Sequence, residues 1–414
     1  MSLSHSKLAT GIQSEGAFEV LVIAKKLIAM GKDVVELEIG DSPFPASTSA
    51  ASAAALAIAD GQTRYAPSVG LPRFREAAAH YVNQEYGFKV GAENILVGPG
   101  AKNFQQLCLE LFVNPGDGVL VFSPHFPTYE ANIARRGARM VLSPLQQSTG
   151  FRPSLGDVQR FLDEDSSPKA IVLNTPHNPT GGVATKEDLE RLADLVRGRD
   201  VGVFSDEPYD QMVWSGKHHS IAAIDGMLDQ CVAGYTFSKT FSMSGWRLGF
   251  AVSSRRNIEA LTKLTSTALS CVPPFTQIAG AAVLQNDLSE RDQHSSEFRV
   301  RLEQLVGDLN AIDGVDCAMP GGSFYAFPSV HALCDSLGIT SHGLAMYLLQ
   351  GADDDFGVAC LGGECFGEAG AGFLRFSVTE RPDRLAKATQ FIKTAVKRSD
   401  RVAAFLAKHP EFAS

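Results

Sequence analysis

Short apolar runs alternate with stretches of helical periodicity through the middle of the chain, from Asn94 to Val252. Several of these runs carry no charged residue, as expected of strands that are buried on both faces of a parallel sheet. The alternation predicts an α/β fold, in which helices cover both faces of a mostly parallel central sheet. The predicted strands are Ile95–Val97, Val119–Phe122, Ala170–Leu173, Val201–Phe204, Val232–Tyr235 and Gly249–Val252.

Beyond Ser289 the pattern changes to a charged helix, a glycine-rich turn, two short strands and a last amphipathic helix. This order of elements predicts a smaller α+β domain. We therefore predict an N-terminal arm that forms part of the small domain (1–46), a large domain (47–288) and a small C-terminal domain (289–414). The predicted elements of the last part are Glu290–Leu309, Gly321-Gly322, Phe324–Pro328, Leu374–Val378 and Arg381–Arg398.

Length, charge and cysteine content exclude several classes of partner and site. The 414 residues exceed the length that one hydrophobic core usually organises, which fits two domains. The net charge is −9 and no basic cluster is interleaved with aromatic residues, so nucleic acid is not an expected partner. No segment reaches the roughly 18 to 20 apolar residues that span a bilayer, so we expect a cytoplasmic protein without membrane contact. Seven scattered cysteines indicate neither a disulfide framework nor a zinc site, and no metal is expected.

Four polar segments follow predicted strands, where open α/β sheets bind their ligands. They are Gly98–Asn103, Asn174–Gly182, Phe204–Tyr209 and Ser238–Arg247. Taken singly, each has a plain structural interpretation as a turn, a helix cap or a solvated surface lysine. Their common position at strand ends favours a shared site.

The segment around Lys239 has the parts of a site for a phosphate and an aldehyde. A lysine that forms an imine needs a neutral amine, which burial and neighbouring cations produce by lowering its pKa. Thr236 and Ser238 can donate to a phosphate, and Arg247 can do so through two N–H groups. The free N–H groups of a helix that begins at Gly100-Ala101 also favour a phosphate.

These motifs occur together and in order in one family. Through them the chain resembles the class I and II aminotransferases of fold type I, which are aspartate-aminotransferase-like, over roughly residues 12 to 400. The resemblance implies the cofactor pyridoxal 5'-phosphate (PLP) and an amino acid:2-oxo acid aminotransferase. The matching segments are Tyr65–Pro72, Asn178–Gly182, Asp206–Tyr209, Ser238-Lys239, Gly245–Arg247 and Leu374–Ser377.

The resemblance implies a role for each residue around the cofactor ring. Lys239 forms the Schiff base and carries the proton between the substrate Cα and the cofactor. Asp206 pairs with the ring nitrogen and keeps it protonated. Asn178 and Tyr209 hydrogen-bond the phenolic oxygen, and Phe126 stacks on the ring. Lys239, Asp206 and Tyr209 are thus the expected catalytic residues.

The resemblance also implies where the phosphate and the substrate bind. Arg375 takes the substrate α-carboxylate, helped by Asn178 and by the backbone of Gly40. Because Arg375 and Gly40 belong to the small domain, we expect substrate binding to draw the domains together. Tyr65 is expected to reach the phosphate of a second subunit, which makes the protein a homodimer. The remaining expected phosphate ligands are Gly100, Ala101, Lys102, Thr236, Ser238 and Arg247.

The motifs do not determine which substrate side chain is accepted. Lys102 falls where an aspartate-using subgroup has a lysine for the distal carboxylate, but Glu15, in the segment Ser14–Phe18 that covers the entrance, would repel such a group. The pair His125-Phe126 and the loop Leu361–Gly367 depart from the commoner family pattern, and we expect both loops to border the substrate pocket.

Two other functions of the same fold remain alternatives. One is a fold-type-I lyase or synthase, C–S lyase-like or cyclopropane-synthase-like, which would use the same cofactor site. The other is the cofactor-binding sensor domain of certain transcription regulators, which follows a DNA-binding domain. The family match begins within about fifteen residues of Met1, so we expect an enzyme and not such a regulator.

Overall fold

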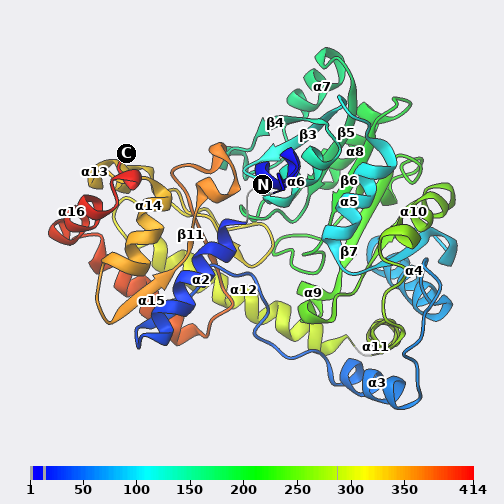
Figure 1. Ribbon diagram of the computed structural model, residues 1–414, viewed down its shortest axis with the longest axis horizontal. Coiled ribbons are helices and arrows are strands. Elements are labelled where there is room, and N and C mark those ends of the chain that lie inside the picture. Colours follow the sequence, from blue (N-terminus) through cyan, green and yellow to red (C-terminus); the bar gives the residue numbers. More distant parts are fainter. Residues whose placement is uncertain (1–2, 13–14, 287) are drawn as a thin grey trace.

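The computed structural model describes residues 3–12, 15–286 and 288–414 of the chain. Figure 1 shows two lobes joined by α12 (Ser289–Asn310) and by the N-terminal chain, whose helix α2 (Gly16–Ala29) lies on one lobe while α3 (Thr48–Ala59) lies on the other. We call the elements from α3 to α11 the large lobe. The small lobe comprises α2, β1 and the elements from α12 onward. Ser14, expected near the entrance of the site, lies outside the described residues, and the domain boundaries stay a prediction.

The large lobe is built around a seven-stranded sheet with the strand order β2-β8-β7-β6-β5-β3-β4. The strands from β7 to β4 pair in parallel, whereas β8 is antiparallel to both of its neighbours. The predicted α/β fold with a mostly parallel sheet is therefore confirmed. The strands are β2 (Ile95–Gly98), β3 (Gly118–Ser123), β4 (Arg139–Pro144), β5 (Pro168–Asn174), β6 (Gly202–Asp206), β7 (Cys231–Thr236) and β8 (Gly249–Val252).

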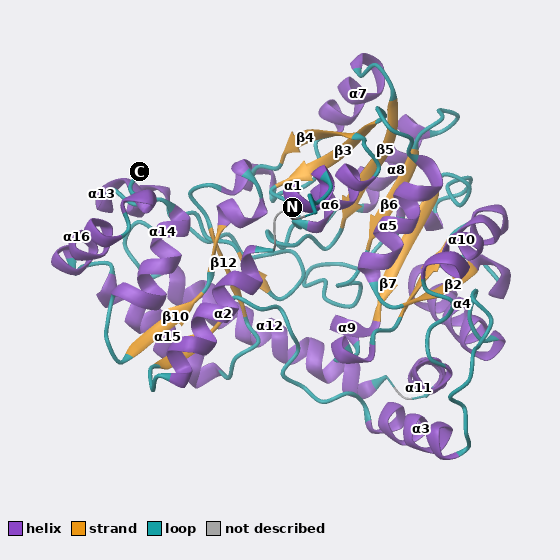
Figure 2. Ribbon diagram, viewed as in Figure 1, coloured by secondary structure: helices purple, strands orange, loops and turns teal. Residues whose placement is uncertain are grey.

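The apolar strands separate two hydrophobic cores. Successive side chains of a strand point to opposite faces of the sheet, so Val119 and Val121 pack in one core with Phe104, and Leu120 and Phe122 in the other. Figure 2 shows the helices on both sides of these strands. The helices of this lobe, besides α3, are α4 (Pro72–Tyr86), α5 (Ala101–Phe112), α6 (Thr128–Arg135), α7 (Leu155–Glu164), α8 (Lys186–Val196), α9 (Phe237–Thr240), α10 (Arg255–Ala268) and α11 (Pro274–Gln285).

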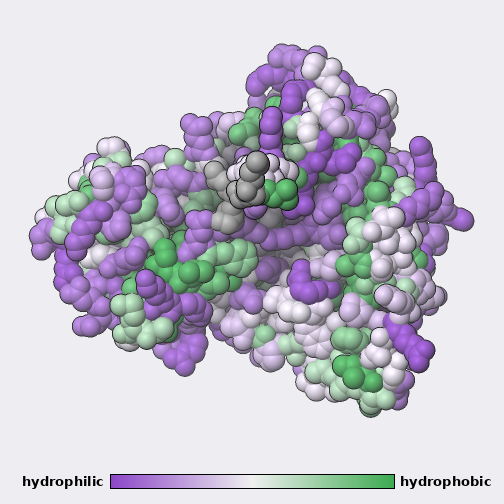
Figure 3. All heavy atoms as spheres, in the orientation of Figure 1, coloured by the Kyte–Doolittle hydropathy of each residue, from purple (hydrophilic) through white to green (hydrophobic). Residues whose placement is uncertain are grey.

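The small lobe contains two short sheets. β1 pairs in parallel with β10, and β12 lies between β11 and β9 in antiparallel pairing. Figure 3 shows apolar side chains gathered over α2, where Phe18 and Val22 are 52% and 68% exposed, so the outer face of this helix is not covered. The elements are β1 (Asp33–Glu36), β9 (Tyr325–Ala326), β10 (Phe356–Ala359), β11 (Leu361–Gly362), β12 (Leu374–Ser377), α13 (His331–Leu337), α14 (Ser341–Met346), α15 (Pro382–Ala395) and α16 (Ser399–Lys408).

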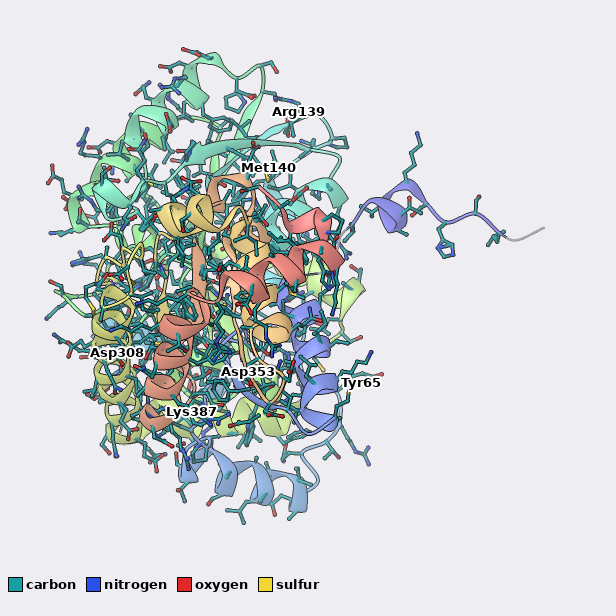
Figure 4. All side chains as sticks on the ribbon, turned by 90° about the vertical axis from the view of Figure 1, so that its left-hand side faces the viewer. Tyr65, Arg139, Met140, Asp308, Asp353 and Lys387 are labelled. Atoms are coloured by element: carbon teal, nitrogen blue, oxygen red, sulfur yellow. The ribbon has the colours of Figure 1, made fainter. Side chains whose placement is uncertain are left out.

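Several elements were not in the sequence-based prediction, among them β4 and α16. Strand β4 was not expected, and its side chains Arg139 and Met140 lie at the outer edge of the sheet (Figure 4). The helix predicted from Arg381 to Arg398 is not the last one, because α15 ends at Ala395 and α16 follows it. The segment that carries α1 (Lys7–Gly11) extends away from the body of the molecule (Figure 4).

Among the described residues, none of the helices has the length and apolar character needed to cross a bilayer. The same part of the chain contains no group of three or more potential metal ligands.

Candidate active site

A cavity of about 360 Å³ lies where β5, β6 and β7 end and α5 and α9 begin, and residues of the small lobe close it from the other side. It therefore occupies the sheet edge at which the sequence predicted a site. The predicted site residues that line this cavity are Gly40, Ala101, Lys102, Phe126, Asn178, Asp206, Tyr209, Thr236, Ser238, Lys239, Arg247 and Arg375. Two predicted residues, Gly100 and Tyr65, do not line it.

Lys239 lies on α9, a single helical turn directly after β7. Thr236 caps this turn by accepting a hydrogen bond from the backbone N–H of Ser238 at 3.2 Å. The Lys239 ammonium donates to the carbonyl oxygen of Gly40 in the small lobe. The pKa of this ammonium is lowered to about 8, mainly by loss of solvent and in part by the nearby cation Arg375, while Asp41 opposes the change. About a tenth of the amine is therefore neutral at pH 7, far more than for an unperturbed lysine.

Asp206 ends β6 and is only 6% exposed. Its Oδ2 accepts a hydrogen bond from the Tyr129 hydroxyl at 2.6 Å, whereas Oδ1 is buried and has no partner among the described residues. The pKa of this carboxyl is raised to about 7, mainly by burial; the hydrogen bond from Tyr129 opposes the rise and the neighbouring Glu207 adds to it. A buried carboxylate with one free oxygen is stabilised by a cationic N–H donor, so Asp206 fits a protonated ring nitrogen.

The phosphate end of the cavity is built from a helix start and a cation. The first turn of α5 follows Gly100 and has no side-chain cap, so its N–H groups are available to an anion. Gly100 has φ of 106°, and a Cβ there would lie 2.8 Å from Nη2 of Arg247, which requires glycine. Arg247 is held by the carbonyl oxygens of Pro99 at 2.7 Å and Ser244 at 2.6 Å. Together these groups fit a phosphate.

Thr236 and Ser238 add hydroxyl groups to this end of the cavity. The Thr236 hydroxyl donates to Ser238 Oγ at 2.9 Å, and both side chains are buried. They lie at the end of β7 next to Lys239, so one short segment supplies both the amine and the hydroxyl donors.

Arg375 is the cation at the opposite end. It lies on β12, is 4% exposed, and is flanked by the rings of Tyr325 at 4.3 Å and Phe366 at 4.9 Å. Its Nη1 donates to Asn178 Oδ1 at 3.0 Å and its Nη2 donates to the carbonyl oxygen of Glu38. Its Nε is buried without a partner among the described residues. A fixed guanidinium with a spare donor fits a carboxylate.

The predicted ring contacts lie between these two ends. Tyr209 is 3% exposed, and its hydroxyl donates to the Tyr325 hydroxyl at 3.1 Å. Asn178 links the loop after β5 to Arg375 in the small lobe. Phe126 lines the cavity and contacts Tyr129 edge-on, with 5.9 Å between ring centroids. The residues expected around a cofactor ring therefore surround one space.

Three residues at the site were not found from the sequence. Tyr129 hydrogen-bonds Asp206, Tyr325 contacts both Tyr209 and Arg375, and Glu38 holds Arg375 through its carbonyl oxygen. Tyr129 had only a weak signal, its position three residues after the predicted ring contact Phe126. Tyr325 and Glu38 had no signal of a role in the site, because neither belongs to a motif that matches the family.

The expectation about the borders of the pocket holds only in part. Phe126 lines the cavity, whereas His125 and the residues of Leu361–Gly367 do not. Instead these two segments bind each other, because the backbone N–H of His125 donates to the carbonyl oxygen of Phe366 at 2.8 Å. His125 is buried, and burial lowers the pKa of its imidazole.

Tyr65 lies apart from the cavity of its own chain. It is 90% exposed and lies at the edge of the molecule in Figure 4. A contact between Tyr65 and the phosphate of a second subunit stays a prediction.

The chain resembles known proteins over most of its length. The family model for aminotransferase class I and II matches residues 32–392. The aspartate aminotransferase of Pyrococcus abyssi is 33% identical over 87% of this chain and 91% of that protein. The aromatic-amino-acid aminotransferase 2 of Thermococcus litoralis is 29% identical over 88% of this chain and 92% of that protein.

Solved structures agree with this match. A single mutant of the aspartate aminotransferase of Thermus thermophilus superposes with a TM-score of 0.87 at 28% identity, covering 95% of this chain and all of that one. The chain therefore belongs to the aminotransferase class I and II family, whose members use pyridoxal 5'-phosphate.

Proposed function

We propose that the protein moves an amino group between an L-amino acid and a 2-oxo acid, with PLP held by Lys239. The observation that carries this proposal is the meeting of three groups in one cavity. These are the amine of Lys239, the half-satisfied carboxyl of Asp206 and the guanidinium of Arg375. They match the three parts of the reaction, which are an amine, a partner for the ring nitrogen and an anchor for the α-carboxylate.

When bound, PLP supplies an aldehyde that condenses with amines and a ring that accepts the electron pair left at Cα when its proton departs. Asp206 supports this role because its free Oδ1 can hold the ring nitrogen protonated. Tyr129 keeps the carboxylate in place through its hydrogen bond to Oδ2. Asn178 and Tyr209 are proposed to donate to the phenolic oxygen, and Phe126 to pack on the ring.

Lys239 is proposed to hold and move the proton. An amine whose pKa is near 8 accepts a proton from a carbon acid and returns it at pH values close to neutral. Its position on the short helix α9, fixed by the Thr236 cap, keeps the amine at one face of the cavity. One group can therefore take the proton from the substrate Cα and deliver it to the cofactor.

Arg375 and Asn178 are proposed to bind the α-carboxylate and to orient Cα toward Lys239. Arg375 belongs to the small lobe and Asn178 to the large lobe, so a carboxylate bound by both would hold the lobes together and exclude water. The phosphate is proposed to be bound by Arg247, by Thr236 and Ser238, and by the N–H groups at the start of α5, at Ala101 and Lys102.

We further propose that the protein is a homodimer in which Tyr65 donates to the phosphate of the other subunit. The support is that Tyr65 belongs to a matching family segment and is 90% exposed on its own chain. A cytoplasmic location is proposed as well, and the absence of disulfides among the seven cysteines agrees with it.

The test is to add single amino acids to the cofactor-loaded enzyme without a 2-oxo acid and to follow its absorbance. A transaminase converts its bound cofactor to the amine form and stops, because the acceptor is missing. A lyase instead restores the starting spectrum and releases pyruvate and ammonia continuously. Steady release of pyruvate from cysteine conjugates, without build-up of the amine form, would contradict the proposal.

A further inference from the structure

Lys102 and Glu15 form an ion pair across the cavity. Lys102 lies on the first turn of α5 in the large lobe, and Glu15 directly precedes α2 in the small lobe. The Lys102 ammonium hydrogen-bonds the Glu15 carboxylate. It also lies 5.2 Å from the ring centroid of Phe126 and 5.9 Å from that of Phe18. The positive charge of this ammonium is thus already balanced by a carboxylate and stabilised by two aromatic rings.

The ion pair between Lys102 and Glu15 determines which charges a substrate side chain encounters in the cavity. The cations that line the cavity are Lys102, Lys239, Arg247 and Arg375. Under the proposed function the last three serve the cofactor and the α-carboxylate. Lys102 is the remaining cation of the lining to which a second carboxylate of a substrate could bind. Such a carboxylate would have to displace Glu15 and would remain close to its negative charge.

An uncharged side chain meets no such barrier. Ala17, Phe18 and Ile39 also line the cavity, and they offer apolar surface to a side chain without disturbing the ion pair. Burial of apolar area is worth about 25 cal/mol per Å². The cavity therefore favours an apolar side chain and penalises an acidic one.

We propose, on the basis of the transaminase function above, that Glu15 makes this enzyme select amino acids with uncharged, apolar side chains over dicarboxylic ones, by occupying Lys102. Glu15 is thereby a specificity-determining residue.

The kinetic test compares L-phenylalanine and L-aspartate as amino donors. The measured quantity is the ratio of their kcat/KM values for the native enzyme, for Glu15→Gln and for the control Glu76→Gln. Glu76 is exposed on α4 and does not line the cavity, so its substitution makes the same charge change elsewhere. The ion pair is partly exposed, with side chains 49% and 19% accessible. We therefore expect Glu15→Gln to shift the ratio toward aspartate by only about fivefold.

Lys102→Gln tests whether this shift passes through the lysine. In the Lys102→Gln background, Glu15→Gln should change the ratio by less than about threefold, because there is no ammonium left to release. A native enzyme that prefers aspartate would overturn the inference. Equal shifts in Glu15→Gln and Glu76→Gln would overturn it too.

A binding measurement separates this inference from the proposed function. The affinities of the cofactor-loaded enzyme for 3-phenylpropionate and for succinate are measured by isothermal titration calorimetry, which needs no turnover. We expect 3-phenylpropionate to bind more tightly, and succinate to gain affinity in Glu15→Gln. If no amino acid converts the cofactor, the transaminase proposal fails, but the two affinities still decide the selectivity. Equal or tighter binding of succinate by the native enzyme would refute the role of Glu15.

Discussion

Replacement of Arg375 by lysine tests how the substrate carboxylate is held. The guanidinium is 4% exposed and uses Nη1 and Nη2 to bind Asn178 and the carbonyl oxygen of Glu38. Lysine keeps the positive charge, but its single ammonium cannot hold both acceptors and a carboxylate in one plane. Each charge-assisted hydrogen bond is worth about 1.5–3 kcal/mol. The loss of about one such bond predicts a decrease of kcat/KM by roughly 10- to 150-fold.

Most of this decrease should appear in KM. The α-carboxylate is bound in both the ground state and the transition state, so its loss weakens uniform binding more than it slows the chemistry. The assay is the half-reaction with varied amino acid, followed by cofactor absorbance. Arg291→Lys is the matched control, because Arg291 is 9% exposed but does not line the cavity. An unchanged KM in Arg375→Lys, or an equal increase in Arg291→Lys, would show that Arg375 does not bind the α-carboxylate.

Three further predictions follow from the site. Asp206→Asn should slow the half-reaction about 10²- to 10³-fold in single-turnover experiments at saturating cofactor, because the ring nitrogen loses its charged partner; an unchanged rate would contradict this role. Cofactor uptake by the apoenzyme should speed up as the pH rises through about 8, since the pKa of Lys239 is lowered and its neutral amine is present above that value; an inflection near 10.5 would disprove it. Tyr65→Phe should raise the Kd for PLP about tenfold in fluorescence titrations, while light scattering still reports a dimer; an unchanged Kd argues against the contact.

The sequence predicts the inner strands of the seven-stranded sheet well, but it predicts the edge strand β4 poorly. Strands such as β5 are buried on both faces and appear as uninterrupted apolar runs. Strand β4 lies at the sheet edge with Leu142 45% exposed, and it begins with Arg139, so it shows neither a continuous apolar run nor a clean alternation. The antiparallel direction of β8 has no local signal either, because strand direction depends on the path of the connecting chain.

The failure to predict helix α16 has a different cause. Ala395 at the end of α15 and Val402 in α16 are both buried and are seven residues apart. Seven residues are about two helical turns. The predicted helix nevertheless ends at Arg398, because α16 has ten residues of which only Val402 and Phe405 are buried, and so short an apolar pattern gives a weak helical signal.

The candidate site was predictable to the extent that its residues lie in motifs. Lys239, Asp206 and Arg375 are found because they stand at fixed positions in recognisable segments. Tyr129 and Tyr325 support two of the catalytic groups from other elements, and such contacts depend on tertiary packing that no local pattern encodes. The ion pair between Lys102 and Glu15 is of the same kind, since it joins two lobes.

The most direct test of the account is to find which lysine holds the cofactor. The loaded enzyme is reduced with borohydride, which fixes PLP to its lysine, and the digested protein is mapped by mass spectrometry. The modified peptide should carry the label on Lys239, and Lys239→Ala should abolish the label. A label on Lys102 or on another lysine of the native enzyme, with Lys239 unmodified, would contradict the central claim.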